Sequence, residues 1–416
     1  MEIVSSTPEP KRQWLGMDFA HDHLVGPLVV RVPTRARAAL SRALADVHRD
    51  EQGAARAFFG VQSWRVPVTS DARLAPWQAE FILRDIVGCS DFGRDEKLAW
   101  EYALLFKGVQ MTLAFQKFGL RVYVDARVNE ATAQEMASAM ASILSSAMPL
   151  LEKTILAEIA DDQVARGEVN VENHYGVLAR QYKHFSDMSE RSLLAADTAQ
   201  PIREAMPGPN TGYIIRFPEV ELREQARFES KAAVLAFFSL LEHLLLIAFL
   251  LDGHDATRGA LAAFIGAGWN DKFKKIVDLR NRESKRHYDH LSALHDELRN
   301  PSAHGEVHSD GTDFLFILPG VGPVPGRLVM RGRRRRLYQW RGGEADDVSR
   351  QLGETEQWLR TGPLAGAVAY GEAGLPLFFG SVLRDELVAV RHDSDALQNA
   401  IGRLSMLVDQ SANMDW

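Results

Sequence analysis

The sequence is almost free of cysteine: Cys89 is the single one among 416 residues. One thiol cannot form an internal disulfide, so the fold does not depend on an oxidising compartment. Cys89 follows an apolar stretch and Gly88, a setting typical of a small buried side chain rather than of a nucleophile. The first residues, MEIVSSTPEPKRQW, lack the apolar core of a secretory signal peptide. We therefore expect a cytoplasmic protein.

Several common catalytic motifs are also missing. The sequence contains no P-loop, no Gly-rich dinucleotide fingerprint and no nucleophile elbow. The segment FIGAGWN (264–270) has two glycines but lacks the required spacing, and we expect a loop between helices there. No repeat of fixed period is visible. The sequence thus gives no sign of a P-loop NTPase, a dinucleotide-dependent oxidoreductase or an α/β-hydrolase, and we expect no cofactor.

Length and composition are those of a soluble protein with a core. Hydrophobic residues make up 46% of the chain and charged residues 25%. The length suggests two or three domains. Proline and glycine concentrate in QPIREAMPGPNTGY (200–213), the best candidate for a domain linker or long loop. We expect a mainly α fold: a mixed, mostly helical region at 1–205, a helical bundle at 214–310, and a small α+β region at 311–416.

Hydrophobic periodicity predicts the elements outside the bundle. Alternation indicates strands at 24–32 and 120–128, and helical spacing indicates helices at 34–49, around 77–86, at 95–117 and at 131–159. After residue 311 we expect a strand with a Pro/Gly turn, further β-structure through RLVMRGRRRRLYQW, a helix at about 344–360, and a less regular tail.

Four helices with short connections are predicted between residues 228 and 308, which describes a compact up-and-down bundle. The first, at 232–251, is long enough to cross a bilayer. Glu242 and His243 lie at its centre, however, and a lone acid at mid-membrane costs roughly 2.5–3.5 kcal/mol. We therefore predict a central core helix or a dimer interface, and no membrane association.

The segment ELRNPSAHG (297–305) carries the strongest chemical signal. It places Arg299, Asn300 and His304 within six positions. Asn300 before Pro301 also matches a helix start, with Asn as the cap and Pro at the first helical position. A break there would place Arg299 and His304 around a helix junction. An uninterrupted helix would set them about 140° apart.

This segment resembles the HEPN family, helical bundles whose ribonuclease members carry Arg, a polar residue and then His within a few positions. Arg299, Asn300 and His304 fit that pattern. The resemblance extends to FFSLLEHLLL (237–246), where Glu242 occupies the place of the acid that family members often have inside a long apolar helix. It covers at most a quarter of the chain.

The resemblance implies a metal-independent endoribonuclease, of the sort used as a toxin or in anti-phage defence. The residue types suit this chemistry. A histidine can move protons near neutral pH while the RNA 2′-hydroxyl attacks phosphorus, and an arginine can stabilise the charge that builds on the phosphate. Asn300 would hold the phosphate or orient His304. The resemblance also implies a homodimer with a composite site.

Structural alternatives accompany each of these assignments. Arg299 and Asn300 also fit a capped turn, and some family members are non-catalytic interaction or nucleotide-binding modules. A carboxylate such as Glu242 in an apolar helix needs a partner, which Arg299 could supply from the bundle. His304 and His308 have the spacing of a metal pair on a helix, but Gly305 and the absence of an HExxH pattern argue against a metal site.

The net charge of -7 conceals a basic segment. From Asp271 to Arg341 there are 15 Lys/Arg and 9 Asp/Glu. Within it, RGRRRRLYQWR (331–341) combines arginines that can neutralise phosphates with aromatic rings that can stack on bases. We expect an RNA-contacting loop or hairpin tip here, and a solvated β-hairpin edge is the alternative. The arginines concerned are Arg331, Arg333, Arg334, Arg335 and Arg336.

Overall fold

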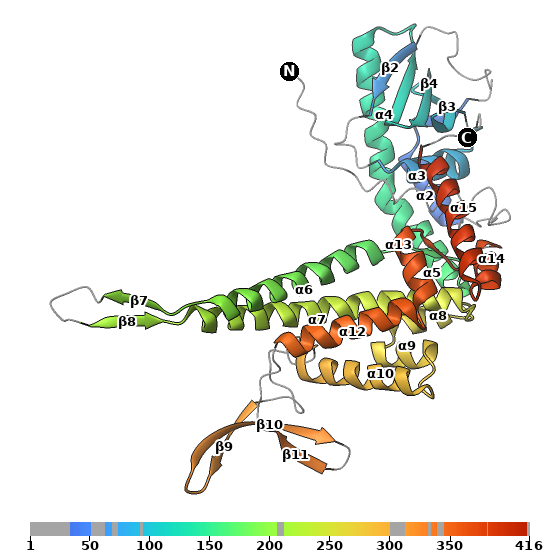
Figure 1. Cartoon of the computed structure of the whole chain (residues 1–416). Helices are drawn as coiled ribbons and strands as arrows, with labels where there is room; N and C mark the ends of the chain where they lie inside the picture. The colour runs from blue at the N-terminus through green and yellow to red at the C-terminus, as the bar shows by residue number, and fades with distance from the viewer. Residues whose placement is uncertain are drawn as a thin grey trace.

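The computed structural model describes residues 34–50, 63–68, 74–91, 95–205, 212–299, 313–331, 334–338, 345–380 and 382–413. The described chain is mainly helical, as expected, and its sheets are small. Its buried apolar residues form two large clusters, one within 36–155 and the other between 175 and 408. Figure 1 shows the ribbon of the two parts of the chain that contain them. The chain therefore has an N-terminal body with its own core and a second, helical body.

The N-terminal body is built on a five-stranded antiparallel sheet with the order β1-β3-β4-β5-β2. Its long helix α4 (Glu130–Leu151) packs against β2 and β5. Helices α2 (Thr34–Ala43) and α3 (Pro76–Phe81) and the π-helix η1 (Ile82–Val87) complete this body. The strands are β1 (Val47–Arg49), β2 (Ser63–Pro67), β3 (Leu98–Phe106), β4 (Val109–Gln116) and β5 (Gly119–Asp125).

The prediction of a helix at 95–117 is wrong, because this segment forms the hairpin of β3 and β4. Most residues of β3 are buried on both faces, so the polar alternation that marks a strand is missing and apolar residues fall at helical spacing by chance. Lys107 and Gly108 form the two-residue turn, with φ of 49° and 79°. Two positive φ values are what this tight turn requires.

Other expectations for this body fare better. The strand expected at 120–128 is confirmed as β5, and the helix at 131–159 is confirmed as α4 with its continuation through η2 (Glu152–Leu156) into α5 (Ala157–Arg166). Asn129 caps α4 by accepting a hydrogen bond from the Thr132 amide. The helix expected at 34–49 ends at Ala43, and β1 takes its last residues. The strand expected at 24–32 lies outside the described residues.

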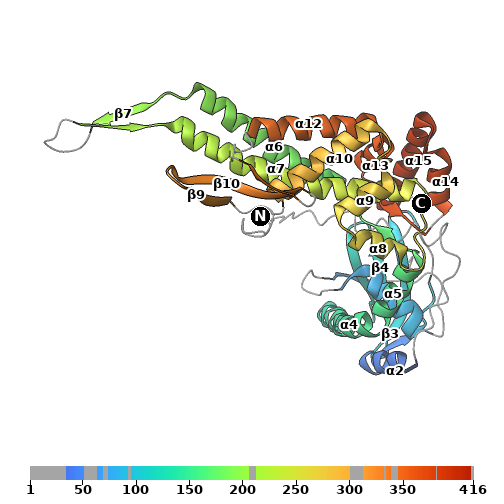
Figure 2. The same ribbon diagram turned by 90° about the horizontal axis from the view of Figure 1, so that it is seen from below.

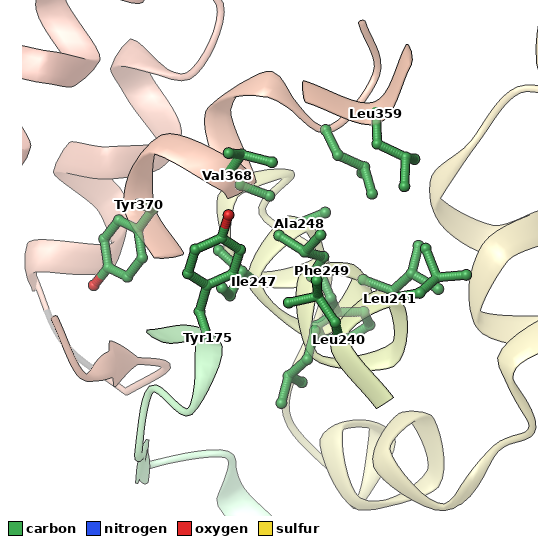
Figure 3. Packing of buried hydrophobic residues seen from close by; sticks show 14 of the residues in the cluster. Tyr175, Leu240, Leu241, Ile247, Ala248, Phe249, Leu359, Val368 and Tyr370 are labelled. Atoms are coloured by element: carbon green, nitrogen blue, oxygen red, sulfur yellow. The ribbon is translucent and has the colours of Figure 1, made fainter. Parts of the chain in front are cut away.

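The helical body is organised around α7 (Pro218–Leu251), which runs antiparallel to α6 (Tyr175–Thr198). The four helices expected between 228 and 308 are confirmed as α7, α8 (Ala260–Gly266), α9 (Trp269–Ile276) and α10 (Arg282–Leu294). Figure 2 shows α6, α7 and α12 (Ala345–Thr361) side by side. Around the C-terminal half of α7, residues such as Leu241, Ile247 and Phe249 are fully buried (Figure 3).

Helix α7 is the one helix in the described chain that is long and apolar enough to cross a membrane. In this structure, 83% of its most apolar window is buried among other elements of the protein. Its sides are covered by α6, α9, α12 and α13 (Ala365–Ala373). The segment is therefore a central core helix, as Glu242 and His243 in its middle predict.

The helical core draws on residues from all three ranges expected as domains. It includes Tyr175 and Tyr182 from α6, and Tyr370 and Leu404 from the C-terminal helices. The prediction of a less regular tail is wrong, because the segment after α12 forms α13, α14 (Val382–Val390) and α15 (Ser394–Asn413). Gly- and Pro-containing segments precede and follow α13, and they obscured the helical periodicity in the sequence.

The Pro/Gly-rich segment at 200–213 connects two helices of the same core. Its ends form the hairpin of β7 (Ile202–Ala205) and β8 (Tyr213–Arg216), which joins α6 to α7. All eight strand residues are exposed. In both views this hairpin lies at the tip of a long arm that projects from the helical body (Figures 1 and 2).

Candidate functional site

Arg299 is the last described residue of the helix that precedes the predicted motif. Helix α10 continues directly into the π-helix η3 (His295–Arg299), which packs against α7. Arg299 is half-buried. Asn300 and His304 lie outside the described residues, as does the helix start expected at Pro301. The structure thus places one of the three predicted catalytic residues, at the end of a bundle helix.

His295 shares η3 with Arg299. Its ring lies 5.3 Å from the ring of Phe238 and 5.5 Å from that of Trp269. One turn of a π-helix takes more than four residues, so residues four apart project to similar sides. The spacing of four before Arg299 was the signal, and it adds an imidazole on the side of η3 that carries the arginine.

The structure pairs Glu242 with a lysine, where the sequence suggested Arg299. Lys272 Nζ donates to Glu242 Oε2 at 2.6 Å. Phe238 lies one turn before Glu242 on α7, and its ring packs at 5.2 Å against Trp269, which lies one turn before Lys272 on α9. This crossing of α9 over α7 sets the lysine above the carboxylate. Glu242 therefore acts in packing the bundle, as half of a largely buried ion pair.

His287, on α10, is a buried residue that packs between helices. Its buried ring stacks on Trp358 at 4.4 Å and 9°. The Thr355 hydroxyl donates to Gln351 O, so it accepts from His287 Nδ1, 3.2 Å away. Burial and the neighbouring Arg286 lower the pKa of His287. The imidazole is thus kept neutral and joins α10 to α12.

His243, next to Glu242 in sequence, points to the other side of α7. The His174 amide donates to its Nε2 at 3.1 Å, and Asn173 Oδ1 lies 3.2 Å from the same nitrogen. Burial and, secondly, His174 lower the pKa of His243 to about 4. Asn173 also donates to Gly371 O at 3.3 Å. This buried polar cluster holds the start of α6 between α7 and α13.

The basic run lies in a three-stranded antiparallel sheet, as the expectation of β-structure there predicts. The strands are β9 (Asp313–Leu318), β10 (Gly322–Arg331) and β11 (Arg334–Tyr338). Arg331 pairs with Arg334, and Val329 pairs with Arg336. Strand alternation therefore sets positions 331, 334 and 336 on one face and Arg335 on the other. Arg333 lies outside the described residues.

A cavity of about 810 Å³ lies in the N-terminal body, far from η3 in sequence. Its lining includes His48, Asp50, Gln110 and Arg127. Gln110 donates to Asp50 Oδ2 at 2.8 Å. The lining combines apolar side chains with polar ones of both charges, and it was not predictable from the sequence because its residues come from separate strands and helices.

Comparisons of the chain with models of known families, with curated proteins and with solved structures found no match in any of the three. The function is therefore inferred from the residues and their arrangement.

Proposed function

We propose that the chain is a metal-independent endoribonuclease of HEPN type, centred on Arg299, Asn300 and His304. One observation carries the proposal: Arg299 ends the last described turn of a bundle helix that packs on α7, and the sequence continues directly with Asn300 and His304. A helix end fixed on a rigid core is a suitable place from which to position catalytic side chains.

The proposed reaction needs no group beyond these side chains and the RNA. His304 accepts the proton of the 2′-hydroxyl, whose oxygen attacks the adjacent phosphorus. The bond from phosphorus to the 5′-oxygen breaks, a 2′,3′-cyclic phosphate remains, and the leaving oxygen takes a proton from solvent water. Arg299 donates to the phosphate oxygens as negative charge builds on them, and Asn300 holds the phosphate or orients His304.

The wider setting is part of the same proposal. The basic positions of the β10–β11 hairpin would bind the RNA backbone. The enzyme would act in the cytoplasm as a homodimer, and the resemblance suggests a toxin or anti-phage role. The burial of α7 inside the protein supports a soluble location.

A second candidate is a non-catalytic interaction module with the same bundle. Exposed apolar side chains on the N-terminal half of α7 favour it, since Phe228 and Val220 present 57% and 65% of their surface to solvent. Exposed apolar side chains that lie together mark interaction sites.

The test is RNA cleavage in the presence of EDTA. We expect the wild type to leave 2′,3′-cyclic phosphate ends, and His304→Ala and Arg299→Ala each to lose at least about 100-fold in rate, the usual size for a general base or a charge-stabilising donor. Arg280→Ala and His392→Ala are matched controls at exposed positions, and they should cleave like the wild type.

Thermal unfolding of each variant separates loss of chemistry from loss of fold. Equal cleavage by wild type, His304→Ala and Arg299→Ala would end the catalytic proposal. Absence of cleavage by a folded wild type, across single-stranded and hairpin RNAs, would favour the interaction module.

A further inference from the structure

The α6–α7 arm has a polar interior. Here the arm means residues 185–198 of α6, the β7–β8 hairpin and residues 218–235 of α7. Ser189 Oγ donates to Ala226 O at 3.1 Å, and Ser192 Oγ donates to Glu229 Oε2 at 2.7 Å, all at buried positions. The buried apolar residues of these parts of the helices are mostly small: Leu193, Ala196, Ala226 and Ala233, with Val234 where the arm joins the main core. So little buried apolar surface stabilises a pair of helices weakly.

The outer side of the arm is apolar where the inside is polar. Val220, Phe228 and Leu235 expose 65%, 57% and 38% of their surface. At 100° per residue, they share a stripe about 80° wide with Glu224 and Lys231. Among the buried positions of this half of α7, Ala226, Glu229, Ser230 and Ala233 lie on the opposite side of the helix, and Val234 lies beside the stripe.

This outer stripe, formed by Val220, Glu224, Phe228, Lys231 and Leu235, is complementary to itself in reverse. Its successive steps of four, four, three and four residues are close to the alternating three and four of a coiled-coil seam. When it is laid antiparallel on a second copy with Phe228 next to the two-fold axis, Val220 meets Leu235 of the second copy. In the same register Glu224 meets Lys231 of the second copy, and each contact occurs twice.

Only the antiparallel arrangement has this property. A parallel pairing would set Glu224 against Glu224 and Lys231 against Lys231, which repel. A two-fold axis needs one self-complementary patch, with apolar residues at the centre and charges that pair across it. The order apolar, acidic, aromatic, basic, apolar along α7 meets that requirement.

We propose that the outer stripe of α7 is a homodimer interface, in which two arms pair antiparallel around Phe228. The second copy then covers the apolar side chains that the arm leaves in solvent. The pairing also explains why the arm is stable despite its polar interior, because each arm supplies the other with an apolar face. This inference does not depend on the ribonuclease proposal.

The test is the mass of the full-length chain, measured by sedimentation velocity over a range of concentrations. We expect a dimer for the wild type. Phe228→Glu should raise the dissociation constant by about 100-fold, the size of a central hot spot. Leu194→Glu is the matched control: Leu194 is 61% exposed, on α6 and away from the stripe, so this variant should dimerise normally.

Charge exchange tests the register. Glu224→Lys leaves only positive charge at positions 224 and 231, and Lys231→Glu leaves only negative charge, so each variant should dimerise poorly. Mixing the two variants should restore dimers, and so should both changes in one chain. A wild type that stays monomeric would overturn the proposal, as would a dimer indifferent to Phe228→Glu or an absence of rescue on mixing.

RNA binding by the stripe in place of a second copy would appear as a monomer whose RNA affinity falls in Phe228→Glu, and it too would overturn the dimer. Circular dichroism at one concentration confirms that each variant remains helical. Loss of dimers with cleavage retained, or cleavage lost with dimers retained, would separate this inference from the ribonuclease proposal.

Discussion

The Lys272 ammonium lies 2.6 Å from the Glu242 carboxylate and exposes only 8% of its side chain. Breaking a buried pair leaves a charge without a partner, which costs about 3–5 kcal/mol when burial is complete. Glu242 retains 29% exposure, so water compensates in part. We expect Glu242→Ala to lower the free energy of unfolding by about 2 kcal/mol in urea titrations.

A double variant separates the charge from the packing. Glu242→Leu combined with Lys272→Met removes both charges and should recover most of the loss. Glu283→Ala is the control, since its pair with Arg286 is exposed and 4.0 Å long, and it should change stability by less than about 0.5 kcal/mol. An unchanged Glu242→Ala would contradict a structural role for this pair.

His243 makes the helical body sensitive to acid. Its pKa of about 4 in the folded chain lies below the ordinary value of 6.5, because the buried ring resists protonation. Its contribution is complete above pH 6.5. As the pH falls toward 4 the unfolded chain takes up the proton first, and up to roughly 3 kcal/mol of stability is lost.

Urea titrations at pH 7 and pH 4.5 measure this loss. In His243→Gln the difference between the two pH values should shrink, whereas His392→Gln, at an exposed position, should keep it. His174 faces the same ring, with centroids 5.9 Å apart, so His174→Gln should raise the pKa of His243 slightly. An unchanged acid response in His243→Gln would refute the assignment.

Two helical glycines should respond oppositely to alanine. In a helix interior, alanine is favoured over glycine by about 1 kcal/mol. Gly353 on α12 has open space around it, and Gly353→Ala should raise the melting temperature. A Cβ at Gly371 on α13 would lie 2.7 Å from the Tyr175 ring, and Gly371→Ala should lower it. Equal shifts of the same sign would contradict the close packing of α6 on α13.

Cys89 should be unreactive in the folded protein. The thiol is 6% exposed, and burial raises its pKa to about 12. At pH 8 about one molecule in ten thousand carries the reactive thiolate. Ellman's reagent should therefore label Cys89 slowly in buffer and at once in 6 M guanidinium, a concentration that unfolds most domains. Full labelling within minutes in buffer would show that the N-terminal body opens readily.

Helices with one apolar face or a strong cap were predictable from the sequence, and strands buried on both faces were not. The bundle helices α7 to α10 and the capped helix α4 appear where periodicity puts them. The prediction for 95–117 was wrong because β3 and β4 are largely buried, so their sequences lack the polar alternation of a half-exposed strand. The secondary structure of such segments depends on pairing with strands elsewhere in the sequence, and the local residue pattern does not reveal that pairing.

The candidate site shows the same division. The sequence singled out Glu242 as an acid that needs a partner, but it suggested Arg299 where the structure has Lys272. The choice depends on how α9 crosses α7, a tertiary relationship set by the contact of Phe238 with Trp269. His295 was missed because it precedes Arg299, whereas the motif follows it; a spacing of four sets the two residues on similar sides of a helix.

The short pairing of β6 (Asn170–Val171) with β12 (Leu377–Phe378) joins segments that lie far apart in the sequence. This separation has a consequence for synthesis on the ribosome. Residues 36–155 contain all the buried partners of the first core, so the N-terminal body can fold while the rest of the chain is being made. The second core must wait, because Tyr175 and Tyr182 on α6 meet their partners from α12 and α13 only after residues beyond 345 emerge. During that interval the apolar half of α7 is exposed, and it is then that the nascent chain depends most on chaperones.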